Sequence, residues 1–320
     1  MTEYLNWGLP IIGYFFLAGT GAGAATVSAS VLLRGGGGGF GGQHFRLARY
    51  GAMIAPLPVM IGSALLILEL GSFEAGSYFK FLYLFSTINL SPMSVGSWLL
   101  MAFIAVSLAY AYTFLDNDAS PNDRMAGRRR ALAWITVPFG IAVAIYTGVL
   151  LGAMPARPFW NSPIIAMLFM ISSLSTGVAA ILLARALLHA EAPASEAKNI
   201  QFGGYLLTAS DLMLIGFEAA IVFLFVMFGY LTVGDVGYAV DVIMPGGSLA
   251  ALFWVGFVLI GLLLPALVEL RYVLPKLLYH KDFSPSRSTE MLVSTVVLLG
   301  GFMLRYVVVI AGQITGPVGI

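Results

Sequence analysis

Charged side chains within long apolar segments are the first candidates for chemistry in this sequence. Five lie there, namely Glu69, Asp211, Glu218, Glu269 and Arg305. A charge inside a membrane is costly, so each one needs a partner, a water-filled cavity or a function. We expect Asp211, Glu218 and Arg305 to form either a proton-conducting polar track or a buried ion pair between Glu218 and Arg305.

The spacing of these residues indicates their depth. Asp211 and Glu218 are seven residues apart, which is about 10 Å along a helix and places them on one helical face. Arg305 is expected in the outer half of the last apolar segment. Glu269 stands close to Arg271, so we expect its carboxylate to reach from the inner interface into water.

Long apolar segments must position these charges. Of the 320 residues, 59% are hydrophobic and 10% are charged, too few charges to cover a soluble domain of this length. A helix of about 20 apolar residues crosses a hydrocarbon core of about 30 Å. The sequence predicts an all-α integral membrane protein with eight transmembrane helices, at residues 9–33, 48–71, 93–115, 131–153, 163–187, 204–231, 247–270 and 290–314.

Positive charge is divided unevenly between the loops. Thirteen Lys and Arg residues fall in alternate loops beginning with Arg34, whereas the opposite loops hold Lys80 and Arg157. Because loops rich in Lys and Arg stay in the cytoplasm, this bias predicts that both termini lie outside the cytoplasm. It also supports an even number of spans.

The sequence provides no obvious ligands for a redox cofactor. It contains no cysteine, which excludes disulfides, thiolate-bound iron–sulfur clusters and Cys-ligated zinc. Its three histidines, His44, His189 and His280, stand in or beside predicted cytoplasmic loops, so none is placed to hold a haem within the membrane. Any redox function is expected to use a lipid-soluble carrier or a cofactor in a partner protein.

Aromatic and small residues near the predicted outer boundary have simpler expected roles. Trp7, Trp98 and Trp160 fall where tryptophan anchors a protein in the lipid interface. The glycines of the string from Gly19 to Gly23 are expected to let two helix backbones approach closely. They would also leave room for a flat ring.

Four strings, in matching order and topology, resemble the polysulfide reductase membrane subunit (NrfD/PsrC) family over essentially the whole sequence. They are Tyr14-Phe-Phe-Leu-Ala-Gly-Thr-Gly-Ala-Gly23, Ser91-Pro-Met-Ser-Val-Gly-Ser-Trp98, Tyr146-Thr-Gly-Val-Leu-Leu-Gly152 with Pro158 and Trp160, and Gly300-Gly-Phe-Met-Leu-Arg305 with Ala311-Gly-Gln313.

This resemblance implies two four-helix bundles, residues 1–153 and 154–320. The first would bind a quinone, either menaquinone or ubiquinone, and the second would be structural or carry a proton path. The protein itself would hold no haem or iron–sulfur cluster. It would exchange electrons at the outer membrane face with a ferredoxin-like four-cluster iron–sulfur subunit, which in turn serves a molybdopterin catalytic subunit.

The candidate quinone-binding residues are Tyr14, Gly19, Glu69, Ser94 and Tyr146. Quinone chemistry couples two electrons to two protons, so such a site needs hydrogen-bond partners for the ring oxygens and a proton route. Tyrosine hydroxyls suit the first role. Glu69 would accept a proton or serve as a structural carboxylate. Some family members have histidine where Tyr14 stands, and this departure puts its direct quinone contact in question.

Three functional hypotheses follow. The first is the quinone-reactive membrane anchor of a multisubunit oxidoreductase in a bacterial or archaeal cytoplasmic membrane. It would be surrounded by lipid, with no nucleic-acid partner. The second is a proton-translocating or conformational coupling subunit. The third, a stand-alone transporter, ranks below both, because no pair of Gly/Pro-broken helices occupies corresponding positions in two repeats.

Overall fold

The computed structural model describes residues 7–35, 44–70, 82, 91–115, 125–188, 197–280, 283 and 285–316. Eight helical spans within these ranges are long and apolar enough to cross a membrane. The protein is therefore an all-α integral membrane protein, as the sequence predicts. Its helices are α1 (Leu9–Arg34), α2 (Phe45–Ile54), α3 (Pro56–Leu70), α5 (Pro92–Tyr112), α6 (Ala126–Gly152), α7 (Pro163–Leu187), α8 (Ala197–Leu231), α9 (Asp235–Asp241), η2 (Leu252–Leu263), α10 (Leu264–Tyr279) and α11 (Arg287–Ile314).

Serine residues start three of the long helices. Ser91, Ser162 and Ser286 each precede a helix, and each side-chain oxygen accepts a hydrogen bond from a backbone N–H in the first turn. Such caps satisfy donors that a helix cannot pair internally. At α5 and α7 the next residue is proline, which suits the first helical position because no N–H is needed there.

Proline also divides the second span into two helices. α2 ends at Ile54, and α3 begins at Pro56. Because Pro56 has no N–H to continue the hydrogen-bond ladder, the helix breaks at this point. The predicted span over 48–71 is thus present as α2 followed by α3.

The seventh span departs most from its prediction of 247–270. It runs from Leu252 to Tyr279, and its first twelve residues form the π-helix η2 before α10 continues. π-helices are rare and occur frequently at functional sites. Gly261 of η2 packs directly on Gly300 of α11, where a Cβ on either glycine would press on the other backbone.

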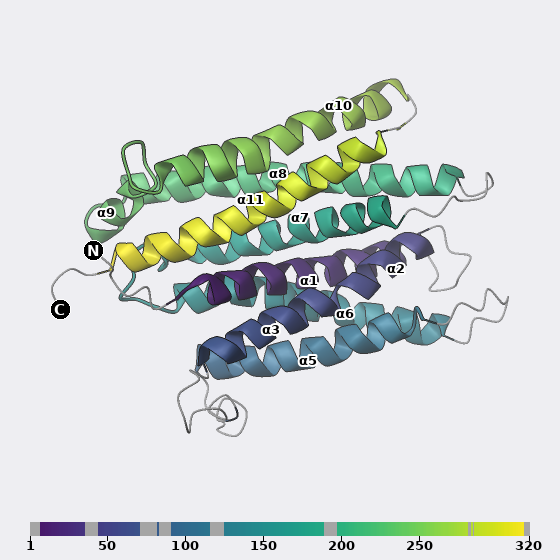
Figure 1. The fold of residues 1–320 in the computed structure, drawn as a ribbon, viewed down its shortest axis with the longest axis horizontal. Coiled ribbons are helices and arrows are strands. Elements are labelled where there is room, and N and C mark those ends of the chain that lie inside the picture. The colour runs from purple at the N-terminus through teal and green to yellow at the C-terminus, as the bar shows by residue number, and fades with distance from the viewer. Residues whose placement is uncertain are drawn as a thin grey trace.

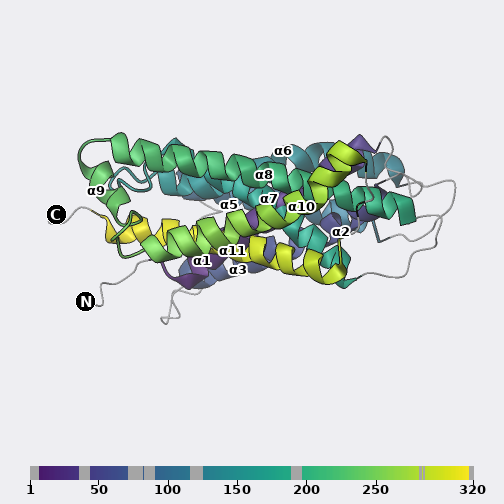
Figure 2. The same cartoon turned by 90° about the horizontal axis from the view of Figure 1, so that it is seen from above.

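The long helices run side by side along the longest axis, in both views (Figures 1 and 2). The start of α1 and the end of α11 lie at one end, where the Trp7 backbone N–H donates to Gln313 Oε1 at 2.9 Å. We call this the terminal end. The opposite end holds the end of α1 with Arg34, the start of α6 with Arg128 to Arg130, and the start of α11 with Arg287. We call it the basic end, and the charge bias predicts that it faces the cytoplasm.

Helix α1 lies at the centre of the molecule and packs along α3, α6 and α7. Its contact with α7 is the closest. A Cβ at Gly23 would overlap the Ser173 carbonyl, and a Cβ at Gly177 would overlap the backbone of Gly23. The glycines of the Gly19–Gly23 string thus allow close backbone approach, as expected for small residues in membrane helices. The division into bundles at residue 153 stays a prediction.

Gly177→Ala should lower the free energy of unfolding by about 1–3 kcal/mol, because the added methyl group collides with backbone that cannot rotate away. Gly216→Ala is the matched control, since nothing lies within 4 Å of a Cβ at that helical position. Unfolding of the purified protein in mixed detergent micelles measures both. Equal stability of the two variants would contradict the close α1–α7 contact.

Candidate functional site

Tyr14 and Tyr146 lie near each other at the terminal end of the molecule. Tyr14 is five residues into α1, and Tyr146 is six residues before the end of α6. The two helices pack along each other. The Tyr14 side chain is 0% exposed, and its hydroxyl has no hydrogen-bond partner in the described part of the protein. A buried hydroxyl without a partner is costly, so this oxygen is available to a ligand or a water molecule.

The start of α5 forms the other side of this site. The Tyr146 ring and hydroxyl lie directly over Gly96, where a Cβ would collide with them. Ser94, two residues earlier, is buried, and its hydroxyl accepts a hydrogen bond from Ser91 Oγ at 3.2 Å. The Ser94 hydroxyl proton is still able to donate. The structure thus brings Tyr14, Ser94 and Tyr146 to the same end, at similar depth.

Gly19 and Glu69 do not join this cluster. Gly19 faces α7 and α11, where a Cβ would lie 2.5 Å from Ser173 Oγ and 3.1 Å from Arg305 Nη2. Glu69 is exposed at the end of α3. Gly62, seven residues earlier in α3, is the residue that packs against the Tyr14 carbonyl. The quinone-binding roles of Gly19 and Glu69 stay predictions, and the geometry gives Gly19 a packing role.

Trp160 is not the lipid anchor that the sequence analysis expected. It is 2% exposed, and its Nε1–H donates to the Val308 carbonyl of α11 at 2.7 Å. Its ring stacks on Trp7 with centroids 5.1 Å apart. Hydropathy alone places it at the boundary, but a buried acceptor for its N–H draws it inward. Trp98, in contrast, is exposed as predicted.

Arg305 lies fully buried between α11 and α7. Its Nη1 donates to Ser172 Oγ at 2.7 Å and to the Gly301 carbonyl at 2.8 Å, and its Nη2 donates to Ser173 Oγ at 3.0 Å. The guanidinium also lies 5.3 Å from the centre of the Phe169 ring. Hydroxyls, a carbonyl and an aromatic face therefore hold this charge.

Glu218 and Arg305 are connected indirectly, through Ser172. Its carboxyl is buried and borders the same small gap as Ser172. Within the described ranges no direct ion pair joins Glu218 to Arg305, so the simple buried pair expected from the sequence is absent. Ser172, Ser175 and Thr176 border a small internal gap beside Glu218 and η2, which gives the carboxyl a polar surrounding.

Asp211 is paired with Glu269, a contact that sequence reasoning missed. Asp211 Oδ1 accepts a hydrogen bond from Ser175 Oγ at 2.8 Å. Its carboxyl is a close neighbour of the Glu269 carboxyl of α10, with no hydrogen bond between the two in the described ranges. Two neighbouring buried carboxyls disfavour ionisation of both, because their like charges repel, so this arrangement favours one proton on the pair. The expectation that Glu269 reaches into interfacial water is wrong, because it is 2% exposed. α10 continues to Tyr279, about 15 Å further along the helix.

One signal would have revealed this network. Residues 172–176 of α7 contain four hydroxyl side chains, those of Ser172, Ser173, Ser175 and Thr176. The Ser172 and Ser173 hydroxyls accept hydrogen bonds from Arg305, and the Ser175 hydroxyl donates to Asp211. A run of hydroxyls inside a membrane span indicates polar groups on the neighbouring helices.

The histidines are placed as predicted where the structure describes them. His44 precedes α2 and His280 follows α10, both at the basic end, and His189 lies outside the described residues. His44 stacks on Phe202 with centroids 5.9 Å apart. Burial, and then the nearby Arg34 guanidinium, lower the pKa of His44.

The sequence also matches known proteins along its length. The profile of the family described as "Polysulphide reductase, NrfD" matches residues 1–317. The protein belongs to the NrfD family. It is 32% identical over 317 residues to the C subunit of polysulfide reductase from Wolinella succinogenes, and this match covers 96% of the present sequence and 94% of that relative. It is 27% identical over 332 aligned positions to protein NrfD of Escherichia coli, covering 98% and 96% of the two sequences.

The NrfD-family strings recognised in the sequence occupy the sites described above. Tyr14 and Tyr146 lie in the terminal-end cluster. Trp160 and Gln313 join the start of α7 and the end of α11 to Trp7, since the Gln313 Nε2 donates to the Trp7 carbonyl at 3.0 Å. Arg305 connects the last string to α7. The matching residues are thus concentrated at one end and along the α7–α11 contact.

Ser172→Ala should lower the free energy of unfolding by about 1–3 kcal/mol, because it removes the hydroxyl shared by Arg305 and Glu218 and leaves buried polar groups unsatisfied. Ser107→Ala is the control. Ser107 is equally buried, but its hydroxyl donates only to the Ile104 carbonyl of its own helix. A detergent-based unfolding titration compares them, and a loss no larger for Ser172→Ala would show that the bridge contributes nothing.

Proposed function

We propose that this protein is the quinone-reactive membrane subunit of a multisubunit oxidoreductase. Membership of the NrfD family supports a role beside reductase subunits, since one relative is named as the C subunit of polysulfide reductase. The observation that carries the proposal is the buried hydroxyl of Tyr14, which has no hydrogen-bond partner among the described residues and lies on a helix packed along the one that holds Tyr146. Two phenols on facing helices match a ligand with oxygen acceptors.

The residues at the terminal end fit a quinone by their chemistry. When bound, a quinone supplies two-electron, two-proton redox chemistry. Tyr14 and Tyr146 would donate hydrogen bonds to its ring oxygens, and Gly96 provides the space in which the Tyr146 ring lies. Ser94 offers a third hydroxyl beside them. The Phe15 ring, packed on Tyr14 and in edge contact with Phe169, gives the site an apolar neighbour.

We further propose that a partner carrying iron–sulfur clusters docks at the terminal end and passes electrons to or from a molybdopterin subunit. The sequence contains no cysteine and provides no thiolate ligands of its own for such clusters. The predicted orientation places the terminal end outside the cytoplasm of a bacterial or archaeal cell. The partner would therefore bind on the outer face of the cytoplasmic membrane.

Tyr146→Phe in the assembled complex should lower quinol-dependent electron transfer about tenfold, the effect of losing one hydrogen bond worth about 1.4 kcal/mol in the transition state. Gly96→Ala should reduce the same rate, because its methyl group displaces the Tyr146 ring. Gly152→Ala is the matched control, with neighbours 3.8 Å from the added Cβ. Glu69→Gln tests whether the exposed carboxylate accepts the released proton.

Assembly is checked by co-purification of the partner subunits through a tag on this protein. If Tyr146→Phe and Gly96→Ala both kept the parental rate with intact assembly, the quinone site would not be at the terminal end.

A second candidate function is supported by the buried acids of α8 and α10. Glu269, Asp211, Glu218 and Arg305 are linked by close contacts and by the hydroxyls of α7. Buried ionisable groups inside a membrane bundle commonly mark proton routes. We propose that this acid track, defined by these four residues, carries protons through the membrane and couples proton movement to quinone chemistry.

Glu218→Gln should lower the number of protons moved per electron in vesicles that contain the assembled complex, because an amide cannot take up and release a proton as a carboxyl does. Simultaneous recording of electron transfer and internal pH gives the ratio. If both the number of protons moved per electron and the electron-transfer rate were unchanged, the acid track would have only a structural role. The proposal for the quinone site would still stand.

A further inference from the structure

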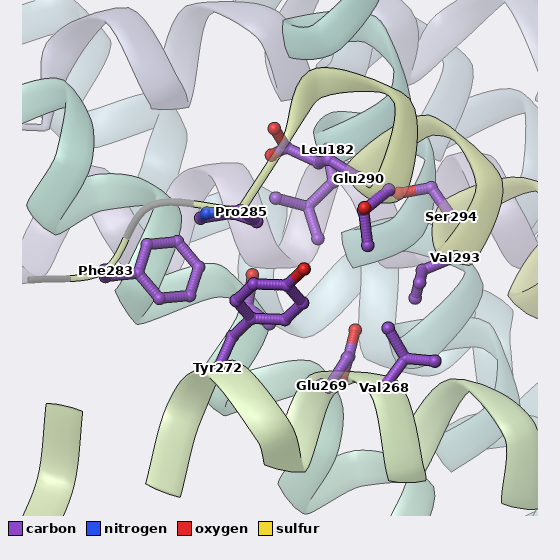
Figure 3. A pocket seen from close by; sticks show the side chains of 11 residues that line it. Leu182, Val268, Glu269, Tyr272, Phe283, Pro285, Glu290, Val293 and Ser294 are labelled. Carbon is purple, nitrogen blue, oxygen red and sulfur yellow. The ribbon is translucent and has the colours of Figure 1, made fainter. Parts of the chain in front are cut away.

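A pocket opens at the basic end between α7, α8, α10 and α11 (Figure 3). Its polar side chains are Thr208, Glu269, Tyr272, Thr289, Glu290 and Ser294. Apolar groups such as Leu182, Val268 and Phe283 complete its walls. No function described above uses this pocket, although Glu269 connects it to the acid track.

Two buried polar side chains in the pocket wall lack hydrogen-bond partners among the described residues. Glu269 is 2% exposed and Ser294 is 1% exposed. Apart from the approach of Asp211, neither Glu269 oxygen has a hydrogen-bond partner in the described ranges, and the Ser294 hydroxyl has none there. Because orphaned polar groups are costly to bury, a pocket lined by them is suited to hold water.

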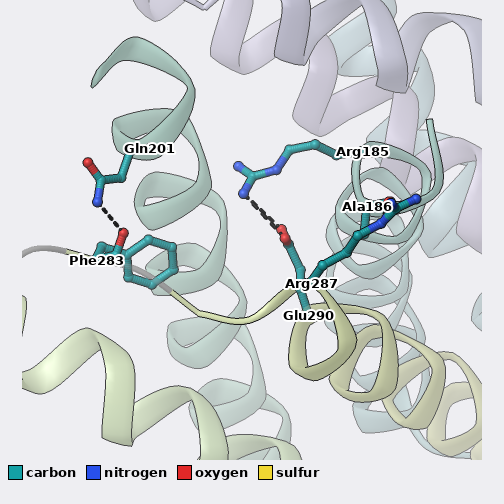
Figure 4. Close-up of polar contacts among 6 residues, drawn as sticks. All are labelled: Arg185, Ala186, Gln201, Phe283, Arg287 and Glu290. Atoms are coloured by element: carbon teal, nitrogen blue, oxygen red, sulfur yellow. Dashed lines mark hydrogen bonds and ion pairs between the residues drawn. The ribbon is translucent and has the colours of Figure 1, made fainter. Parts of the chain in front are cut away.

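The mouth of the pocket is held by contacts between distant segments (Figure 4). Arg185 of α7 pairs with Glu290 of α11, with Nη2 to Oε1 at 3.1 Å. Arg287 donates from Nε to the Ala186 carbonyl at 2.6 Å. Gln201 of α8 donates to the Phe283 carbonyl at 2.5 Å. These links fix the Glu290 carboxylate, paired with Arg185, beside the opening.

One face of α11 continues from the mouth to the centre of the molecule. Glu290, Ser294, Gly301 and Arg305 follow at intervals of four, seven and four residues, which keep them on one side of a helix. From Glu290 to Arg305 the face is about 22 Å long. Thr208 is three residues before Asp211 on α8 and also lines the pocket. The pocket and the acid track therefore share Glu269 and adjoin each other along α8 and α11.

We propose that this pocket is the site at which protons enter the acid track, with Glu269 as the internal proton acceptor and Glu290, positioned by Arg185, as the collecting carboxylate. A hydronium ion in the pocket gives its proton to the Glu269 carboxylate and becomes water. Once Asp211 has released its own proton towards Glu218, Glu269 passes the new proton to the Asp211 carboxylate and can accept another. This inference rests on the proposed proton function of the acid track.

The absence of cysteine from the sequence allows a direct test of water access. Ser294→Cys in the full-length protein, reconstituted in nanodiscs, should react with a small charged methanethiosulfonate reagent about tenfold faster than Ser107→Cys, since only an accessible, hydrated thiol ionises and reacts. Ser107 is also 1% exposed but lies in α5, away from the pocket. Thr289→Cys at the mouth is the second variant if Ser294→Cys folds poorly. Equal rates at Ser294 and Ser107 would overturn the proposal.

Proton access itself is measured by infrared spectroscopy of the same samples after transfer to D2O. The protonated carboxyl band of the Asp211–Glu269 pair, identified by its loss in Glu269→Gln, should shift with deuteration. A bulky thiol reagent on Ser294→Cys should slow that shift about tenfold, as blocked solvent access slows exchange. An unchanged rate in the blocked sample would show that protons reach the pair by another route.

Neither measurement requires quinone or partner subunits. A complex without quinol-dependent turnover would therefore contradict the proposed quinone function while leaving this test intact. A third outcome is possible, in which blocking the pocket slows deuterium exchange but Glu218→Gln leaves the number of protons moved per electron unchanged. In that case protons would reach the Asp211–Glu269 pair and go no further along the acid track.

Discussion

The contact between α1 and α7 fixes the geometry on which the other sites depend. At Gly23 and Gly177 the two backbones approach so closely that any side chain would overlap the facing helix. This contact brings Ser173 against Gly19 and places the hydroxyls of α7 within reach of Arg305 and Glu218. In lipid, where apolar burial gives helices little reason to associate, such close packing and interhelical hydrogen bonds are what hold a bundle together.

From this contact the molecule separates into two polar regions of different character. At the terminal end the polar groups are the hydroxyls of Tyr14, Ser94 and Tyr146, which are neutral, and Tyr14 packs on the Phe15 ring. Along α7 the polar groups are acids and an arginine connected by serines. A neutral cluster suits a neutral carrier, and a series of carboxyls suits protons. The two regions approach each other at Gly19. This glycine faces Ser173 and Arg305, and it stands five residues after Tyr14 in α1.

Much of the fold was predictable because length and hydropathy determine membrane spans. All eight spans were predicted, and the depths of Tyr14 and Tyr146 followed from their positions in the helices. The errors arose where one helix meets another. Glu269 was placed at the interface because the prediction missed the last turns of α10. Trp160 was also placed at the interface, because the carbonyl that accepts its N–H lies on α11, 148 residues away in the sequence. The Asp211–Glu269 pair and the position of Ser172 likewise depend on which helices are neighbours in space, and this cannot be deduced from a single sequence. The hydroxyl run of α7 was the one local signal for them.

Photo-crosslinking tests the central claim, that a quinone binds between α1, α5 and α6 at the terminal end. An azido-quinone is irradiated with the assembled complex, and labelled peptides of this protein are identified by mass spectrometry. Our account predicts label on the peptides that contain Tyr14, Ser94 or Tyr146, competed away by unmodified quinone and reduced in Gly96→Ala but not in Gly152→Ala. Competed label confined to α8, α10 or α11 would contradict it.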